Sequence, residues 1–212
     1  MFANDTGLIV VISGPSGGGK STVVRSVLAS DPAAFFYSVS DTTRAIRTGE
    51  EEGRDYHFIS REEFSARYER GYYLEHNCYT GSSAYYGTPK APVEAALAEN
   101  RIAVLEIDVN GGRQVKAVYP AQTLLLFLMP PTLSELEGRL RGRQDDTMTE
   151  ERIQSRLAAA RREVDSLAEY DAIIYNLNNR QDRAVCDVRG AIDAFIARRR
   201  FLLDAGRCFL GE

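Results

Sequence analysis

The chain has 212 residues, of which 44% are hydrophobic and 26% are charged, enough for one substantial core and too few for two full-sized independent domains. Its net charge of −4 differs from the basic balance that is usual in nucleic-acid-binding proteins. The longest apolar runs, Leu8–Ile12 and Leu124–Met129, are far shorter than the roughly 20 residues that span a bilayer. The sequence opens without a basic segment and an apolar stretch, and its three cysteines suggest no disulfide framework. We therefore expect a cytoplasmic protein without nucleic-acid or membrane partners. The sequence does not indicate its oligomeric state.

Apolar runs and amphipathic segments alternate along most of the chain. Buried strands are predicted at Leu8–Ser13, Ile102–Ile107, Thr123–Leu128 and Ala172–Tyr175. Helices are predicted at about Lys20–Ala29, Pro92–Ala98, Gly112–Val118, Thr132–Arg141, Glu150–Leu167 and Asp182–Arg200. Capping boxes open two of them, Thr132 with Glu135 and Thr147 with Glu150. This alternation predicts an α/β fold, a parallel sheet with helices on both faces.

Two stretches interrupt the alternation. Residues 37–89 are rich in aromatic, Ser/Thr and Gly residues, with strand-like pieces and one short helix that opens with Ser60 and Glu63. They predict a small α+β insertion. Gly142–Thr149 is polar and charged, which is typical of a mobile loop, and we expect residues 142–158 to form a short lid. The remaining residues, 1–36, 90–141 and 159–212, form the core of a single domain in this interpretation.

A phosphate-binding loop follows the first predicted strand. Gly14-Pro15-Ser16-Gly17-Gly18-Gly19-Lys20-Ser21 fits G-x-x-x-x-G-K-[ST] and directly precedes a predicted helix. Its glycines let backbone N–H groups converge on a phosphate at the positive end of a helix dipole. In such a P-loop Lys20 reaches the β- and γ-phosphates, and the Ser21 hydroxyl binds Mg²⁺. We assign the loop and the next residue, Thr22, to ATP. Because no N-K-x-D segment is present, a GTPase is disfavoured.

A polar segment further along the chain carries a second set of anion-binding residues. Arg44 and Arg47 lie three apart, and two planar guanidinium groups can clamp a phosphate dianion. The segments Ser38–Glu50 and Gly53–Phe58 closely resemble the GMP-binding part of guanylate kinases. The resemblance continues, in the family's order and spacing, through Tyr73–Glu75, Tyr85–Thr88, Leu105–Gly111, Arg139–Arg143, Arg156–Leu157 and Ile174–Asn176. It covers residues from Leu8 to about Phe195 and implies a P-loop nucleoside monophosphate kinase that transfers the ATP γ-phosphoryl group to GMP and dGMP.

The resemblance assigns roles to single residues. The GMP phosphate would be bound by Arg44, Arg47, Tyr56 and Tyr86, and the base by Ser40, Glu75, Thr88 and Asp108. Glu50 is a further GMP-binding residue in this assignment. A carboxylate at Glu75 accepts the two donors of guanine, N1–H and N2–H₂, while Asp108 helps to hold the amino group. Ser40 and Thr88 would donate to O6.

Three arginines are implied near the phosphates in transit. Arg139, Arg143 and Arg156 match family residues that close on the transferred group, and positive charges there would offset the charge of a loose transition state. Together with Lys20 and Arg44 they form the expected catalytic set. Glu106 would hold Mg²⁺ through water, and Asn176 matches a residue near the adenine.

The chain departs from the family pattern in one place that bears on the site. The segment from Gly81 to Gly87 is two residues longer than the usual one, by Ser82 and Ser83, and can displace Tyr86. Two alternatives stay open at this point: a non-catalytic peptide-binding scaffold of guanylate-kinase-like sequence, and a kinase for another small phosphorylated acceptor. Lys20 and Ser21 argue against the first, and Glu75 argues against the second.

Overall fold

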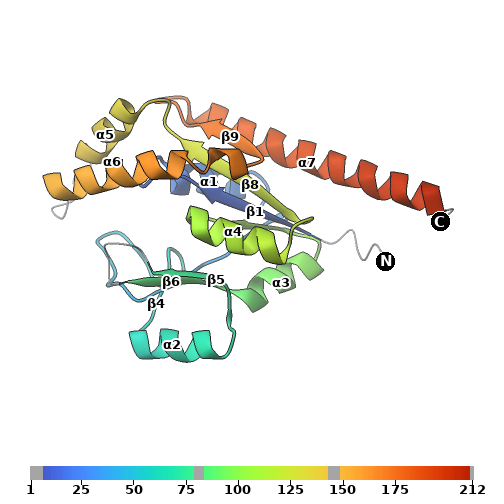
Figure 1. Ribbon diagram of the computed structural model, residues 1–212, viewed down its shortest axis with the longest axis horizontal. Helices are drawn as coiled ribbons and strands as arrows, with labels where there is room; N and C mark the ends of the chain where they lie inside the picture. Colours follow the sequence, from blue (N-terminus) through green and yellow to red (C-terminus); the bar gives the residue numbers. More distant parts are fainter. Residues whose placement is uncertain (1–6, 79–83, 143–148, 211–212) are drawn as a thin grey trace. The chain divides into compact units, whose positions relative to one another are not determined.

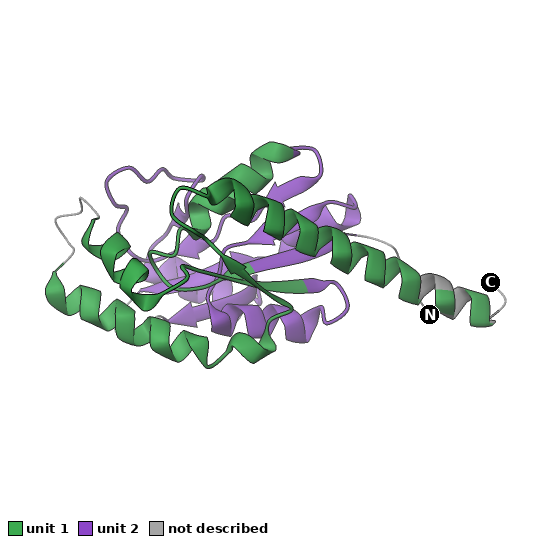
Figure 2. Ribbon diagram, turned by 90° about the horizontal axis from the view of Figure 1, so that it is seen from above, with its two compact units in different colours: residues 1–5, 12–30, 124–212 green, residues 6–11, 31–123 purple. Residues whose placement is uncertain are grey.

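The computed structural model describes residues 7–78, 84–142 and 149–210. Within these ranges the chain forms two compact units (Figure 2): unit 1 is built from residues 12–30 and from the described part of 124–212, and unit 2 from residues 7–11 and the described part of 31–123. No helix in the described ranges has the length and hydropathy needed to cross a membrane.

The main sheet has five strands in the order β2-β7-β1-β8-β9. Their bounds are Phe35–Tyr37 for β2, Ile102–Leu105 for β7, Leu8–Ser13 for β1, Thr123–Met129 for β8 and Ala172–Tyr175 for β9. β7 pairs in parallel with β1 and with β2, and β8 pairs in parallel with β9. Every residue of β1 is buried, as expected for a strand covered on both faces. The predicted parallel α/β architecture is therefore confirmed.

Four helices surround β8 and β9 in unit 1. They are α1 (Lys20–Ser30), α5 (Leu133–Arg141), α6 (Glu150–Val164) and α7 (Gln181–Leu210). α1 packs on α7, and α5 packs on α6; Figures 1 and 2 show the two pairs on opposite sides of β8 and β9. Apolar side chains fill the space between α5 and α6: Leu136, Leu140, Ile153, Leu157 and Ala160.

Unit 2 contains the expected α+β segment. Its second sheet has the order β4-β3-β6-β5, formed by His57–Phe58, Asp41–Thr42, Tyr85–Pro89 and Tyr73–Cys78 respectively. β6 pairs antiparallel with β3 and β5, while β3 and β4 are parallel. The helix α2 (Arg61–Glu69) is capped by Ser60 and stacks Phe64 on Tyr73, with 4.6 Å between the ring centroids. Two more helices complete the unit, α3 (Lys90–Ala98) and α4 (Val109–Val118).

Several predicted boundaries were wrong, for local reasons. α4 begins at Val109 rather than Gly112, because Asp108 caps it and accepts a hydrogen bond from the Gly111 N–H at 2.8 Å. β7 ends at Leu105, two residues early. α6 ends at Val164, and the 3₁₀ turn η1 (Leu167–Glu169) follows.

The two predicted capping boxes had different outcomes. Thr132 accepts the Glu135 N–H at 3.1 Å, as predicted. The second helix begins at Glu150, but its cap is Thr149, which accepts the Arg152 N–H, so the Thr147 assignment was wrong. Both threonines precede the helix, and the sequence pattern favoured the one followed three residues later by glutamate.

Candidate active site

The P-loop lies in unit 1 between β1 and α1. Gly14, Gly17 and Gly19 have φ values of 140°, 94° and 89°, which residues with a Cβ rarely adopt. A Cβ at Gly14 would also collide with the Leu128 carbonyl of β8. The loop can therefore keep this shape only with glycine at these positions, and the shape leads the chain into the N-terminus of an 11-residue helix, where an anion is favoured.

Lys20 is held across this loop. Its Nζ donates to the carbonyl oxygens of Gly14 at 2.7 Å and Pro15 at 3.2 Å. These contacts keep the ammonium group over the loop rather than in solvent. Ser21, the next residue, is exposed at the first turn of α1, and Thr22 uses its backbone carbonyl to accept from Gln181 of α7.

Asn176 and Arg139 brace the P-loop from two other elements of unit 1. The Asn176 side chain is 7% exposed and donates through Nδ2 to the Gly18 carbonyl at 2.9 Å. Arg139 of α5 donates to the same carbonyl at 3.1 Å and to the Asn176 carbonyl at 2.6 Å. Its Nε and Nη2 also donate to Asn178. Both residues therefore contact the P-loop itself and brace it, whereas the sequence predicted Asn176 near the adenine and Arg139 near the transferred phosphate.

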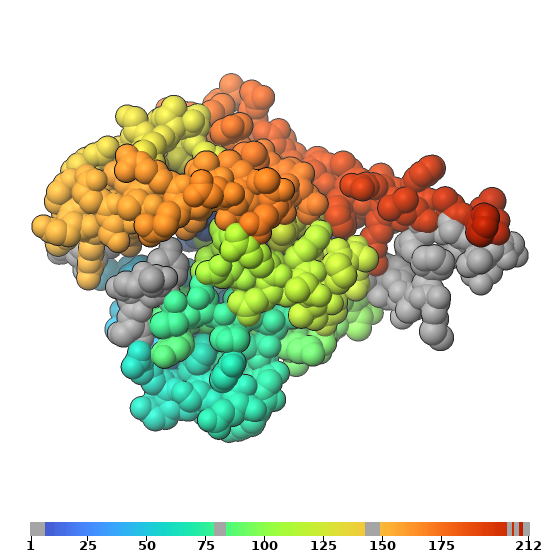
Figure 3. All heavy atoms as spheres, in the orientation of Figure 1, coloured from blue at the N-terminus to red at the C-terminus, as the bar shows by residue number. Residues whose placement is uncertain are grey.

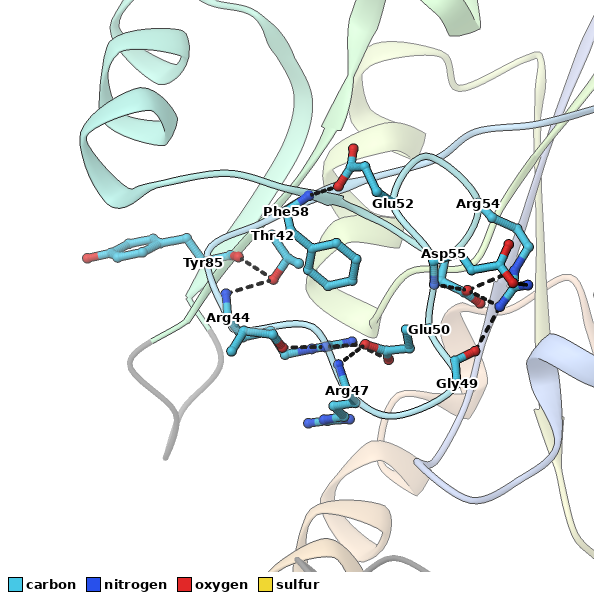
Figure 4. Close-up of polar contacts among 12 residues, drawn as sticks. Thr42, Arg44, Arg47, Gly49, Glu50, Glu52, Arg54, Asp55, Phe58 and Tyr85 are labelled. Carbon is cyan, nitrogen blue, oxygen red and sulfur yellow. Dashed lines mark hydrogen bonds and ion pairs between the residues drawn. The ribbon is translucent and has the colours of Figure 1, made fainter.

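In unit 2, Arg44 forms a planar pair with Glu50 (Figure 4). Nη1 and Nη2 donate to the two carboxylate oxygens at 2.6 and 2.7 Å, and Nη1 also donates to the Ala45 carbonyl. Burial opposes the charge, but the hydrogen bonds that Arg44 donates to Glu50 raise the pKa of Arg44 above its usual range. In the described part of the chain, the Nε–H and the second Nη2–H have no assigned acceptor. A guanidinium group has five N–H donors, so one edge remains for an anion.

Two aromatic side chains lie beside this guanidinium group. The Tyr56 ring lies 4.8 Å from the Arg44 Cζ and packs edge-on against Tyr86, with 5.8 Å between the centroids. Burial raises the pKa of Tyr56 to about 12, and the nearby carboxylate of Glu106 adds to the shift. Tyr56 therefore remains a neutral donor near pH 7, which is what a phosphate requires. The structure brings together Arg44, Glu50, Tyr56 and Tyr86, four of the residues to which the resemblance assigns GMP binding.

Arg47 is not part of this cluster. Its side chain is exposed, and Figure 4 shows it pointing away from the Arg44–Glu50 pair. Its backbone N–H donates to Glu50 at 3.0 Å and so helps to fix that carboxylate. A phosphate contact from Arg47 needs a change of rotamer.

Glu75 is the centre of a second cluster in unit 2. The side chain is 3% exposed, and the Thr88 hydroxyl donates to Oε1 at 2.6 Å, with the Ser40 hydroxyl a further 3.2 Å from Thr88. Burial raises the pKa of Glu75 to about 7; Thr88 opposes this and the charge of Asp108 adds to it. Since the Thr88 proton is directed to Glu75, Ser40 is the donor in its contact with Thr88, and the two hydroxyl groups form a chain that ends at the carboxylate.

The first turn of α4 closes this cluster. Asp108 caps α4 through Oδ1, and its Oδ2 accepts a hydrogen bond from Asn77 of β5. Gln114 exchanges two hydrogen bonds with the backbone of His76 and ties α4 to β5. A Cβ at Gly111 would lie 2.5 Å from the Glu75 Oε2. Only glycine lets the helix approach the carboxylate so closely.

The other predicted residues are placed less specifically. Arg156 is half-buried on α6, and Glu106 directly follows β7 in unit 2. Arg143 lies outside the described residues, as do most of the predicted lid loop and the inserted Ser82 and Ser83. No group of three or more potential His, Cys, Asp or Glu metal ligands occurs in the ranges that the structure describes.

The sequence and the structure of the chain were compared with those of known proteins. A family model described as guanylate kinase matches residues 7–195. A guanylate kinase of Enterococcus faecalis is 45% identical over 173 residues, 82% of each chain, and one of Lactobacillus delbrueckii subsp. bulgaricus is 40% identical over 208 residues, 98% of each. The chain belongs to the guanylate kinase family. The structure of the guanylate kinase from Anaplasma phagocytophilum superposes with a TM-score of 0.71 at 29% identity, covering 90% of this chain and 87% of that one.

Sequence reasoning missed several residues that support the predicted site residues. Asn77 and Asn178 hydrogen-bond to Asp108 and Arg139, and Gly111 makes room for Glu75. Gln114 ties α4 to the backbone of His76, next to Glu75. A usable signal existed for Gly111, because a glycine in the first turn of a helix lowers its stability and indicates a close approach. The other three are ordinary polar residues whose partners depend on tertiary structure.

Proposed function

We propose that this chain is a guanylate kinase that transfers the γ-phosphoryl group of ATP to GMP, giving ADP and GDP, with dGMP as a second acceptor, in cytoplasmic purine nucleotide metabolism. The observation that carries the proposal is the buried Glu75 carboxyl group with Thr88, Ser40 and Asp108 around it. A guanine edge presents two adjacent donors and one acceptor. A buried carboxylate beside the Ser40 hydroxyl, whose proton can turn from Thr88 to a base oxygen, matches that order, whereas adenine would place its amino group against the hydroxyl.

The P-loop would hold the ATP phosphates. Backbone N–H groups of Gly14 to Thr22 and the ammonium group of Lys20 face the β- and γ-phosphates in this assignment, and Asn176 and Arg139 keep the loop in shape. Arg139, Arg143 and Arg156 would offset the charge that spreads over the transferred group.

The acceptor phosphate would bind to the open edge of Arg44. Glu50 fixes the guanidinium plane, and Tyr56 and Tyr86 supply hydroxyl donors, with Arg47 joining after a rotamer change. The attacking phosphate oxygen is already negative near pH 7, because its second pKa is about 6. Catalysis then requires positioning and charge stabilisation rather than a strong base.

Mg²⁺ is the expected cofactor of ATP. The Ser21 hydroxyl and the Glu106 carboxylate are hard oxygen donors of the kind that Mg²⁺ takes, and one or two protein ligands suffice when phosphates provide the others. Bound there, the ion would neutralise charge on the β- and γ-phosphates. In this proposal residues 37–89 form the GMP-binding insertion, residues 142–158 the lid, and residues 1–36, 90–141 and 159–212 the core of a single domain.

The proposal is tested by ADP release with GMP, dGMP, IMP, AMP, UMP and CMP as acceptors. We expect GMP to be used best and AMP to be slower by about 10⁴ in kcat/KM, since mismatched polar groups discriminate on that scale. Lys20→Met is the control for contaminating kinases and should lose all transfer. Equal turnover of GMP and AMP would refute guanine specificity, and no turnover with any acceptor would favour the scaffold alternative.

A second variant separates base recognition from general catalysis. Glu75→Gln keeps the shape of the side chain but replaces one acceptor with a donor. The resulting fall in kcat/KM for GMP should correspond to a loss of about 2–4 kcal/mol of transition-state stabilisation. IMP lacks the 2-amino group, so its kcat/KM should fall less than that of GMP. The ratio of kcat/KM for GMP to that for IMP should therefore be smaller in the variant. An unchanged ratio would show that Glu75 does not recognise the 2-amino group of guanine.

A further inference from the structure

A pocket lies in unit 1 beside the P-loop. Its volume is about 220 Å³, and it is bounded by the end of β8, the turn at Pro130 and Pro131, the start of α5 and the end of α6. Figure 3 shows α5 and α6, in yellow and orange, side by side at the surface of this unit. Of the residues assigned to a nucleotide, the pocket touches Pro15 alone.

Flat apolar groups form much of the pocket wall. The rings of Pro15, Pro130 and Pro131 line it, together with leucines of α5, and the fully buried Phe127 lies behind them. Rigid, flat faces suit a planar ring better than a flexible chain, because fewer rotamers are lost on binding. The volume is below the roughly 300–1,000 Å³ of sites for drug-sized ligands, so it admits a single substituted ring.

One positive charge lies at the edge of this apolar wall. Arg161 of α6 lines the pocket, is exposed, and has no hydrogen bond or ion pair with any residue in the described ranges. Arg141 of α5 differs, since Glu137 and Glu150 both pair with it. A guanidinium group with free donors next to an apolar pocket is complementary to a ring that carries one anionic group.

We propose that this pocket is a ligand site, separate from both nucleotide sites, for an aromatic carboxylate of one ring. The ring lies against the prolines, and the carboxylate pairs with Arg161. ATP and the carboxylate bind at the same time. The proposal does not depend on the identity of the acceptor nucleotide.

Methionine methyl NMR tests the proposal directly. The chain has three methionines, and Met129 lines the pocket; Met129→Leu assigns its signal in protein labelled with [methyl-¹³C]methionine. Titration with 4-methylbenzoate should shift this signal saturably, with a Kd on the order of 1 mM for so small a ligand. The neutral isostere 4-methylbenzamide should bind about fivefold more weakly, since it lacks the charge that pairs with Arg161.

Two arginine variants locate the anionic contact. Arg161→Gln should abolish the preference for the carboxylate over the amide. Arg162→Gln is the matched control, because Arg162 is exposed on the same helix and does not line the pocket; it should keep the preference. Ala160→Leu adds three carbons to the wall and should abolish the shift, while its Tm verifies that the variant is folded.

Four outcomes would overturn the proposal. They are the absence of a saturable shift at Met129, equal binding of the carboxylate and the amide, equal effects of Arg161→Gln and Arg162→Gln, and displacement of the probe by saturating ATP. The last result would assign the pocket to the nucleotide site. Activity toward GMP is measured separately, so loss of the proposed kinase function would leave this test intact.

Discussion

Glu75 combines burial with a task that requires its charge. Its side chain is 3% exposed and burial raises its pKa to about 7, so near neutral pH about half of the molecules hold a protonated carboxyl group. A protonated carboxyl group presents its own donor to the N1–H of guanine. Binding of the base must therefore remove this proton.

We predict that GMP binding releases about half a proton per site from Glu75 at pH 7. Calorimetry in two buffers of different ionisation enthalpy measures the number of protons released. Because the folded pKa is raised, the carboxylate that binds guanine is lost as the pH falls through 7, and GMP affinity should fall with it. Glu75→Gln is the control. Its binding of GMP should release only the protons that come from the GMP phosphate. Equal proton release by both proteins would show that Glu75 is already ionised.

The residues of the acceptor site could be predicted from the sequence, but their mutual contacts could not. Motif spacing led to Arg44, Glu50 and Glu75. It did not indicate that Glu50 occupies one side of the Arg44 guanidinium group, or that Thr88 directs its proton to Glu75. Such contacts depend on rotamers and strand register, and β5 shifts register between Tyr73 and Glu75.

At the scale of elements, α4 and β5 approach each other through Gly111. We predict that Gly111→Ala lowers kcat/KM for GMP by roughly 10–100-fold, because the new Cβ displaces a carboxylate that cannot move into solvent. The KM for ATP should not change. The variant is checked by steady-state kinetics with each substrate varied in turn.

Gly190→Ala is the matched control for that variant. Gly190 lies within α7, and a Cβ there meets nothing within 4 Å. Alanine should stabilise the protein by about 0.5–1 kcal/mol through helix propensity and leave both KM values unchanged. If Gly111→Ala left the kinetic constants unchanged, as Gly190→Ala should, the close approach of α4 to Glu75 would not matter for GMP turnover.

The P-loop depends on the segment after β9. We predict that Asn176→Asp weakens ATP binding by about 1–3 kcal/mol, because a buried carboxylate replaces the amide that donates to the Gly18 carbonyl. Asn178→Asp is the control: Asn178 is exposed and accepts from Arg139, a role that a carboxylate keeps, so ATP affinity should change less than about twofold. Titration with a fluorescent ATP analogue compares the two variants, and a larger loss in Asn178→Asp would contradict the bracing role of Asn176.

At the scale of the whole molecule, Glu75 makes stability depend on pH. Its pKa is raised from 4.5 to about 7 in the folded protein, so between these values the native state binds more protons than the unfolded state. Raising the pH through this window therefore lowers the free energy of unfolding. We predict that the free energy of unfolding of the wild-type protein falls by on the order of 2 kcal/mol between pH 5 and pH 8 because of Glu75. In Glu75→Gln this fall should be absent. Urea unfolding at both pH values measures it, and parallel pH profiles for the two proteins would contradict the prediction.

The fold class followed from the sequence more completely than the details of its elements. Alternating strands and helices are sufficient to predict a parallel sheet, and the change of composition at residues 37–89 was sufficient to predict the α+β segment. The strand order β2-β7-β1-β8-β9 could not be predicted from pattern alone, since it depends on which crossovers pack. α7 also ends at Leu210 rather than Arg200, because a helix can continue where no apolar periodicity requires it.

The length of α7 has a kinetic consequence. Ala184, Val188 and Ile192 are buried, whereas Phe201 and Phe209 are 71% and 90% exposed, and the family match ends at residue 195. Starting a helix is costly and extending one is cheap, so the buried first half acts as a permanent nucleus from which the distal turns grow. The helix should therefore open one turn at a time from Leu210 inward, and backbone amides should exchange with solvent in a graded series along its axis.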